Sequence, residues 1–94
     1  MQVVSIDKVG DTLYGCVDDG VHYHFFVSVR GCPVDCERTV AKGTFQDYHG
    51  FARFCVEQDP NTMILEEPVY APAASLDELT YDILLDLWER VWVR

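Results

Sequence analysis

Residues 12–29 read TLYGCVDDGVHYHFFVSV and predict a β-hairpin. Asp19-Gly20 favours a two-residue type I′ turn, because that turn needs positive φ angles that Asp and Gly tolerate. The second arm is rich in β-branched and aromatic residues, which favour strands. Its alternation predicts one face with Val21, Tyr23, Phe25, Val27 and Val29, and another with His22, His24, Phe26 and Ser28. We expect the first of these faces to enter the core.

The flanking residues extend this hairpin into a larger sheet. A strand over 3–9 precedes a Gly10-Asp11 turn, and alternation over 34–42 predicts a fourth strand after the break at 30–33. The segment 44–47 resembles a helix start, and the apolar spacing after it predicts a helix over roughly 45–58. A short strand over 62–66 would end before Pro68, and residues 70–74 would form a linker.

The C-terminal segment predicts the longer helix. Ser75-Leu76-Asp77-Glu78 is a capping-box sequence, so the helix should run from there towards the end of the chain. The fold class predicted is α+β, with one domain over residues 1–94. An antiparallel sheet of three to five strands, starting with an N-terminal meander, would be packed on one face by both helices.

The charge balance limits the partners. Asp and Glu number 16 against 7 Lys and Arg, which gives a net charge of −9. Residues 59–94 hold 8 acids and 2 bases, whereas residues 1–58 hold 8 acids and 5 bases. This charge disfavours direct binding to nucleic acid or to anionic membranes and favours a basic partner. Without a signal sequence or an apolar run of about 20 residues, the sequence predicts a cytoplasmic protein.

The cysteines and histidines raise two chemical alternatives. Cys32 and Cys36 have the C-x3-C spacing of some zinc sites, and His22 and His24 share a strand face, but no second clustered pair completes a ligand set. A Cys32–Cys36 disulfide would require an oxidising compartment, and reduced thiols are expected in the cytoplasm. His49 and Cys55 face apart on their helix. With no catalytic motif present, we expect neither enzymatic activity nor a metal or other cofactor.

The C-terminal helix presents two surfaces beyond its core-facing arc. Its helical spacing places the carboxylates in one acidic stripe of Glu78, Asp82, Asp86 and Glu89. An adjacent flank contains Tyr81, Leu85, Trp88 and Trp92. An exposed aromatic flank is typical of an interaction site, and its residue types are enriched at binding hot spots. Alternatively, the strands or the linker cover the flank, the stripe is merely solvated, or a second copy covers the flank in a homodimer.

In length, charge and predicted fold, the chain resembles small acidic inhibitors encoded by phages and mobile elements, such as anti-CRISPR and anti-restriction proteins. The resemblance implies a nucleic-acid mimic in a host cell, whose carboxylates occupy the basic channel of a nucleic-acid-processing complex. The function expected is therefore inhibition through protein–protein interaction with a basic protein or nucleoprotein complex. The alternatives are an immunity or antitoxin protein that neutralises a nuclease, and a small Cys/His metal-binding protein.

Overall fold

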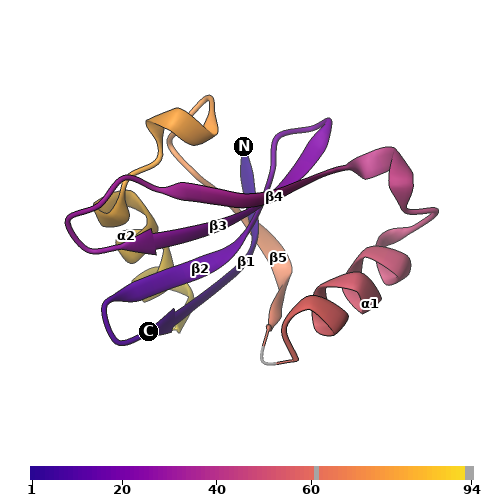
Figure 1. Cartoon of the computed structure of the whole chain (residues 1–94), viewed down its shortest axis with the longest axis horizontal. Coiled ribbons are helices and arrows are strands. Elements are labelled where there is room, and N and C mark those ends of the chain that lie inside the picture. Colours follow the sequence, from indigo (N-terminus) through magenta and orange to yellow (C-terminus); the bar gives the residue numbers. More distant parts are fainter. Residues whose placement is uncertain (61, 93–94) are drawn as a thin grey trace.

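The computed structural model describes residues 1–60 and 62–92 and contains a five-stranded antiparallel sheet with two α-helices (Figure 1). The strands lie in the order β4-β3-β2-β1-β5. Their bounds are Gln2–Val9 for β1, Thr12–Asp18 for β2, His22–Val29 for β3, Asp35–Ala41 for β4 and Ile64–Tyr70 for β5. The helices are α1, Tyr48–Gln58, and α2, Tyr81–Trp92. This confirms the α+β class, the antiparallel meander and the longer C-terminal helix.

The turn between β2 and β3 differs from the prediction by one residue. Asp18 pairs with Tyr23, and the backbone N–H of Asp19 donates to the carbonyl oxygen of His22 at 3.1 Å, so the two loop residues are Gly20 and Val21. Of these two, Gly20 alone has a positive φ, of 99°. Glycine at the first loop position is typical of a type II′ turn rather than the predicted type I′. Asp19 therefore ends the ladder instead of occupying the turn.

The fifth strand is longer than predicted and lies at an edge of the sheet. The prediction ended it before Pro68, but Pro68 lies inside β5. A proline has no N–H to donate, and it is tolerated in a strand whose outer side has no neighbour. β5 pairs antiparallel with β1 through Gln2–Tyr70, Val3–Val69 and Ser5–Ile64. Tyr70 consequently belongs to the strand and not to the predicted linker.

Both helices begin later than predicted. α1 starts at Tyr48, because the Asp47 carboxylate accepts a hydrogen bond from the N–H of Gly50 at 2.8 Å and caps the helix. Ahead of α2, residues Leu76–Glu78 form one 3₁₀ turn, and Leu79 is extended. The Thr80 hydroxyl then accepts from the N–H of Ile83 at 3.2 Å at the start of α2. The predicted helix from residue 76 is therefore wrong in its first turn, and its end at 93–94 lies outside the described residues.

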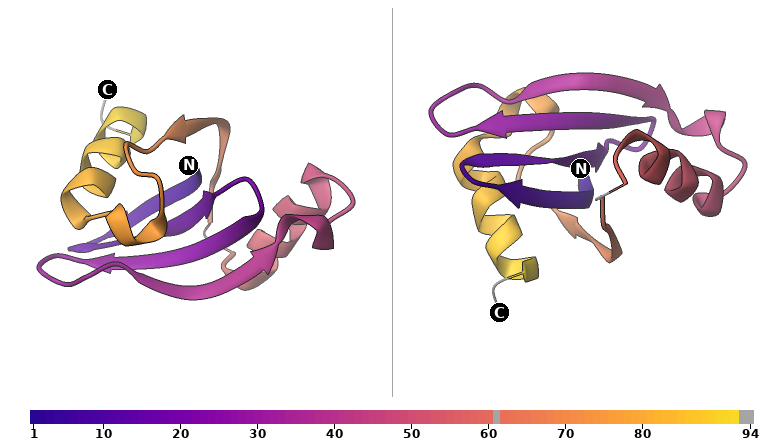
Figure 2. Two further views of the ribbon diagram at one scale, coloured as in Figure 1. Left: turned by 90° about the horizontal axis from the view of Figure 1, so that it is seen from above. Right: turned by 60° about the horizontal axis from the view of Figure 1, so that its bottom comes forward.

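The prediction that one face of the sheet packs under both helices is wrong, because each helix covers its own face (Figure 2). Adjacent residues of a strand point to opposite faces. On β2, Val17 belongs to the core under α2, while the neighbouring Cys16 belongs to the core under α1. On β3, Phe26 lies under α2 and Tyr23 under α1. The face of β3 that was not expected to enter the core thus supplies Phe26, which is 1% exposed, whereas Val21 on the expected face is 64% exposed.

A close approach between the backbones of β1 and β2 requires a glycine at position 15. The β1–β2 register shifts between Val3 and Ser5, and the backbone of Ser5 lies against Gly15. A Cβ at Gly15 would overlap the Ser5 carbonyl oxygen and lie 2.7 Å from its carbonyl carbon. Glycine is therefore required at this position for steric reasons and not for its φ angle.

Candidate functional sites on the C-terminal helix and beside Cys36

The outer surface of α2 carries three exposed carboxylates, Asp82, Asp86 and Glu89, which we call the acidic ridge. They follow one another at helical spacings of four and three residues and so lie along one side of the helix. Asp86 forms an ion pair with Arg90 at 2.9 Å, and both side chains are well exposed. Such an exposed pair contributes well under about 1 kcal/mol and leaves the ridge open to a partner.

Glu78 does not continue the acidic ridge along the helix. It lies in the 3₁₀ turn ahead of α2, and its Oε2 accepts a hydrogen bond from the backbone N–H of Ala74 at 2.6 Å. The four-residue stripe predicted from a single long helix is therefore reduced to the three residues that α2 itself carries. The sequence pattern was correct for these three because they lie within one uninterrupted helix.

The aromatic flank is less exposed than predicted. Tyr81 is buried, at 6% exposure, and belongs to the core under α2, and Leu85 and Trp88 are half-buried against that core. The Lys8 ammonium lies 5.2 Å from the centre of the Trp88 ring and covers part of it. Trp92 remains 40% exposed. The alternative in which strand residues cover this flank is thus the arrangement found for Tyr81, and Trp92 is the flank residue most available to a partner.

The four cysteines fall into two groups. Cys16 and Cys55 are buried free thiols in the core under α1. Burial raises the pKa of Cys55 to about 11 and also raises the pKa of Cys16, so both thiols are protonated at neutral pH. Cys32 and Cys36 are free and exposed. Within residues 1–60 and 62–92, no three His, Cys, Asp or Glu side chains lie together in a group that could hold a metal ion.

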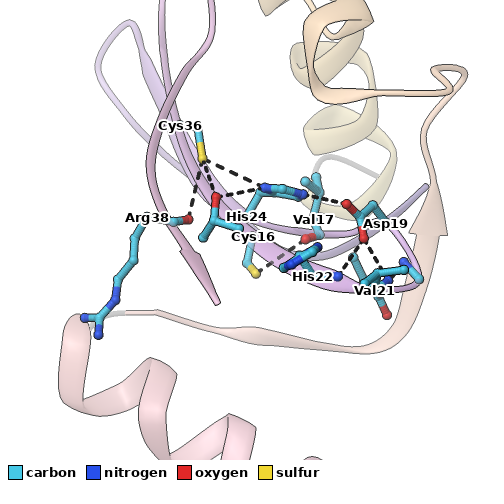
Figure 3. Close-up of polar contacts among 11 residues, drawn as sticks. Cys16, Val17, Asp19, Val21, His22, His24, Cys36 and Arg38 are labelled. Atoms are coloured by element: carbon cyan, nitrogen blue, oxygen red, sulfur yellow. Dashed lines mark hydrogen bonds and ion pairs between the residues drawn. The ribbon is translucent and has the colours of Figure 1, made fainter. Parts of the chain in front are cut away.

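Cys36 on β4 is one end of a row of polar side chains that runs across β3 to Asp19, which lies between β2 and β3 (Figure 3). The Nε2 of His24 lies 2.6 Å from Oδ2 of Asp19. On the other side of the ring, Nδ1 lies 3.1 Å from the hydroxyl oxygen of Thr39 and 4.0 Å from the Cys36 sulfur. The Thr39 hydroxyl and the Cys36 sulfur are themselves 3.3 Å apart. We call Asp19, His24, Thr39 and Cys36 the thiol row.

Asp19 orients the histidine in the thiol row. Although burial opposes ionisation of this carboxyl group, hydrogen bonds from the backbone N–H groups of His22 and Val21 and from His24 lower the pKa of Asp19 well below its usual value. The ionised carboxylate can only accept a hydrogen bond, so it holds a proton on Nε2 of His24. The Nδ1 atom of the neutral ring is then the acceptor, and it faces Thr39 and Cys36.

The prediction did not find the thiol row, although it named most of its members. The sequence predicts Asp19 in the turn, His24 on the strand face opposite the one expected to enter the core, and Cys36 at a spacing from Cys32 that some zinc sites use. The missing information was strand register: His24 pairs with Thr39 across β3 and β4, and Phe26 pairs with Cys36, after an irregularity between Phe25 and Phe26. Cys32 and Cys36 are both free thiols, so the alternative of a disulfide between them is not formed in this structure.

A cavity of about 300 Å³ lies between the sheet and α1. Its walls include Ser5, Cys16, Arg38, Cys55, Gln58 and Asp59. Arg38 donates a hydrogen bond to the side-chain oxygen of Gln58 at 2.8 Å, which ties β4 to the end of α1 at this cavity. Cys36 is not among the lining residues, so the thiol row and the cavity are separate features.

Comparison of this chain with protein-family models, curated proteins and solved structures found no match. No helix within residues 1–60 and 62–92 has the length and apolar composition needed to span a membrane.

Proposed function

We propose that this protein is a non-enzymatic inhibitor that binds a basic surface of a nucleic-acid-processing complex through the acidic ridge of α2. The observation that carries the proposal is the exposure of Asp82, Asp86 and Glu89 along one side of a helix in a chain of net charge −9. A basic channel that normally holds phosphates would accept such a row of carboxylates, and blocked access of nucleic acid would be the inhibitory effect.

The acidic ridge and the neighbouring Trp92 contribute differently to binding. The carboxylates of the ridge steer a basic partner towards α2 and raise the association rate, and salt screens this effect over a Debye length of about 8 Å at physiological ionic strength. Trp92 follows Glu89 by three residues and is 40% exposed, so it lies next to the ridge on the helix. A tryptophan at this position supplies apolar contact area that salt does not screen.

Affinity capture from the cells in which the protein acts, followed by a competition assay, tests the proposal. The ridge variant Asp82→Asn/Asp86→Asn/Glu89→Gln should lose the captured complex, and wild-type protein should displace a labelled nucleic acid from that complex. Glu78 is left unchanged, because its bond to Ala74 makes it part of the local structure. The matched control is Glu57→Gln/Glu66→Gln/Glu67→Gln, which removes the same charge from exposed positions outside α2.

The control separates a local site from general electrostatics. The proposal expects the control variant to bind and displace nucleic acid as the wild type does. Equal loss of binding in both variants would mean that binding depends on net charge alone. Unchanged binding by the ridge variant would mean that α2 is not part of the interface. If the captured protein is a single toxic nuclease, the function becomes that of an immunity or antitoxin protein.

A homodimer through the aromatic flank stays a prediction. The burial of Tyr81 and the partial cover of Trp88 by Lys8 leave Trp92 as its main exposed contact. Light scattering at micromolar concentration, repeated with Trp92→Ala, checks this point. A dimer weakened by the substitution would mean that a second copy competes with the partner for the same end of α2.

A further inference from the structure

The two exposed thiols of this protein have different surroundings. Cys32 lies in the turn between β3 and β4, and within the described part of the chain its thiol forms no hydrogen bond. Cys36 lies on β4 in the thiol row, where its sulfur is 3.3 Å from the Thr39 hydroxyl and 3.5 Å from the carbonyl oxygen of Arg38. Both residues are exposed, so Cys32 serves as an accessible thiol that lacks the polar surroundings of Cys36.

The hydrogen-bond directions in the thiol row form a path from sulfur to imidazole. Asp19 holds the proton of His24 on Nε2, so Nδ1 accepts from the Thr39 hydroxyl at 3.1 Å. With its own hydrogen engaged in this way, the Thr39 oxygen can accept from the thiol of Cys36 at 3.3 Å, and the Arg38 carbonyl oxygen at 3.5 Å is the second acceptor for the same thiol hydrogen. Transfer of the thiol proton to Thr39 and of the Thr39 proton to His24 then leaves a thiolate next to an imidazolium. The Asp19 carboxylate stabilises the positive charge of that imidazolium.

We propose that Cys36 is a nucleophilic thiol, with His24 as its general base through Thr39, and that it reacts with small disulfides to form a mixed disulfide. The thiolate of Cys36 attacks one sulfur of the disulfide, a new S–S bond forms and the original S–S bond breaks. The leaving thiolate takes up the proton from His24 through Thr39. One disulfide and one thiol are consumed and one of each is produced, so no further oxidant is required.

The position of Cys36 favours a small disulfide over a larger substrate. Cys36 is exposed on β4, which is the outer strand at its end of the sheet, and it lies outside the lining of the cavity under α1. The cavity under α1 is therefore not a cleft that would hold and orient an acyl substrate at this thiol. Thiol–disulfide exchange depends on access and on the nucleophile, and a peptide-sized disulfide such as oxidised glutathione meets the open edge without such a cleft.

The test measures how fast each thiol of the reduced full-length protein reacts with oxidised glutathione at neutral pH. Peptide mass spectrometry assigns the mixed disulfide to Cys36 or Cys32, and Cys32 serves as the internal reference for an accessible thiol. We expect Cys36 to react at least about tenfold faster than Cys32. The variant Cys32→Ser should keep the fast reaction, and Cys36→Ser should lose it. Equal rates at the two cysteines would overturn the proposal.

Two further variants test the path through Thr39 and His24. His24→Gln and Thr39→Val should each slow the reaction of Cys36 about tenfold and leave that of Cys32 unchanged. Thr39→Ser, which keeps the hydroxyl, should restore the fast rate, a result that a purely structural role for Thr39 would not produce. Circular dichroism of each variant verifies the fold. If folded His24→Gln reacts as fast as wild type, accessibility alone explains Cys36 and the proposal is wrong.

Discussion

The indole Nε1–H of Trp92 donates a hydrogen bond to the backbone carbonyl oxygen of Ile6 at 2.9 Å. Ile6 lies beyond Ser5, the last residue of β1 that pairs with β5. Ile6 is fully buried and lies beyond the pairing with β5, so its carbonyl oxygen needs a hydrogen-bond partner outside the strands. The last turn of α2 supplies that partner, so the helix is anchored to the sheet across 86 residues of sequence.

Replacement of this donor should reduce stability. We expect Trp92→Phe to lower the free energy of unfolding by about 1 kcal/mol, because the Ile6 carbonyl loses its partner while most of the aromatic contact is kept. Tyr70→Phe is the control, since Tyr70 is 72% exposed. Its effect should stay within about 0.5 kcal/mol. Urea unfolding of both variants measures the difference, and equal stability would show that solvent satisfies the Ile6 carbonyl.

The contact between Gly15 and Ser5 gives a second prediction. Gly15→Ala should destabilise the protein by about 1–3 kcal/mol or more, because the new methyl group overlaps backbone atoms that cannot move without disturbing the β1–β2 ladder. Gly43→Ala is the matched control, because a Cβ there meets nothing within 4 Å. It should be neutral or stabilising by about 0.5 kcal/mol, since alanine restricts the unfolded chain. A thermal melt of each variant that gave equal midpoints would contradict the close approach.

The burial of Phe26 on β3 and the exposure of Val21 in the turn before it predict which of the two side chains matters more for stability. Phe26→Ala should cost about 3–5 kcal/mol, because it empties a fully buried site under α2. Val21→Ala, on the face that the sequence pattern assigned to the core, should change stability by less than about 0.5 kcal/mol. Denaturant titration distinguishes the two. The reverse order would contradict the burial of Phe26 and the exposure of Val21.

Asp7 gives a pH-dependent prediction. Burial raises the pKa of Asp7, and the nearby Asp59 carboxylate raises it further. A hydrogen bond from the backbone of Met63 lowers this pKa, but by less than burial raises it. The folded protein therefore binds a proton at Asp7 more strongly than the unfolded chain does, so ionisation above the ordinary pKa of 3.8 reduces stability as pH rises.

Asp7→Asn removes this ionisation and keeps an oxygen that can accept a hydrogen bond. The variant should be more stable than wild type at neutral pH, and the advantage should disappear below pH 3.8. Glu57→Gln, an exposed change of the same charge, should show no such dependence. Urea unfolding at the two pH values provides the measurement, and an advantage that persisted in acid would assign the gain to packing instead.

Local patterns in the sequence determined the strands, the approximate helices and the acidic side of α2. Alternation with a period of two identified β1 to β4 within one or two residues at each end, since a strand exposes every second side chain to the same environment. The stripe from Asp82 to Glu89 was found because helical spacing depends only on the chain itself. The predicted helix starts were too early, because Asp47 and Thr80 supply the caps in place of the earlier cap sequences.

Tertiary structure alone decided which face of each strand is buried and which distant side chains meet. The sequence of β3 has apolar residues on both faces, so its pattern is equally compatible with a helix on either side, and the two helices in fact use both. Asp19, His24 and Cys36 come together because the β3–β4 register and the turn at Gly20–Val21 place them side by side. A shift of one residue in either would turn these side chains to opposite faces, and nothing local in the sequence specifies that register.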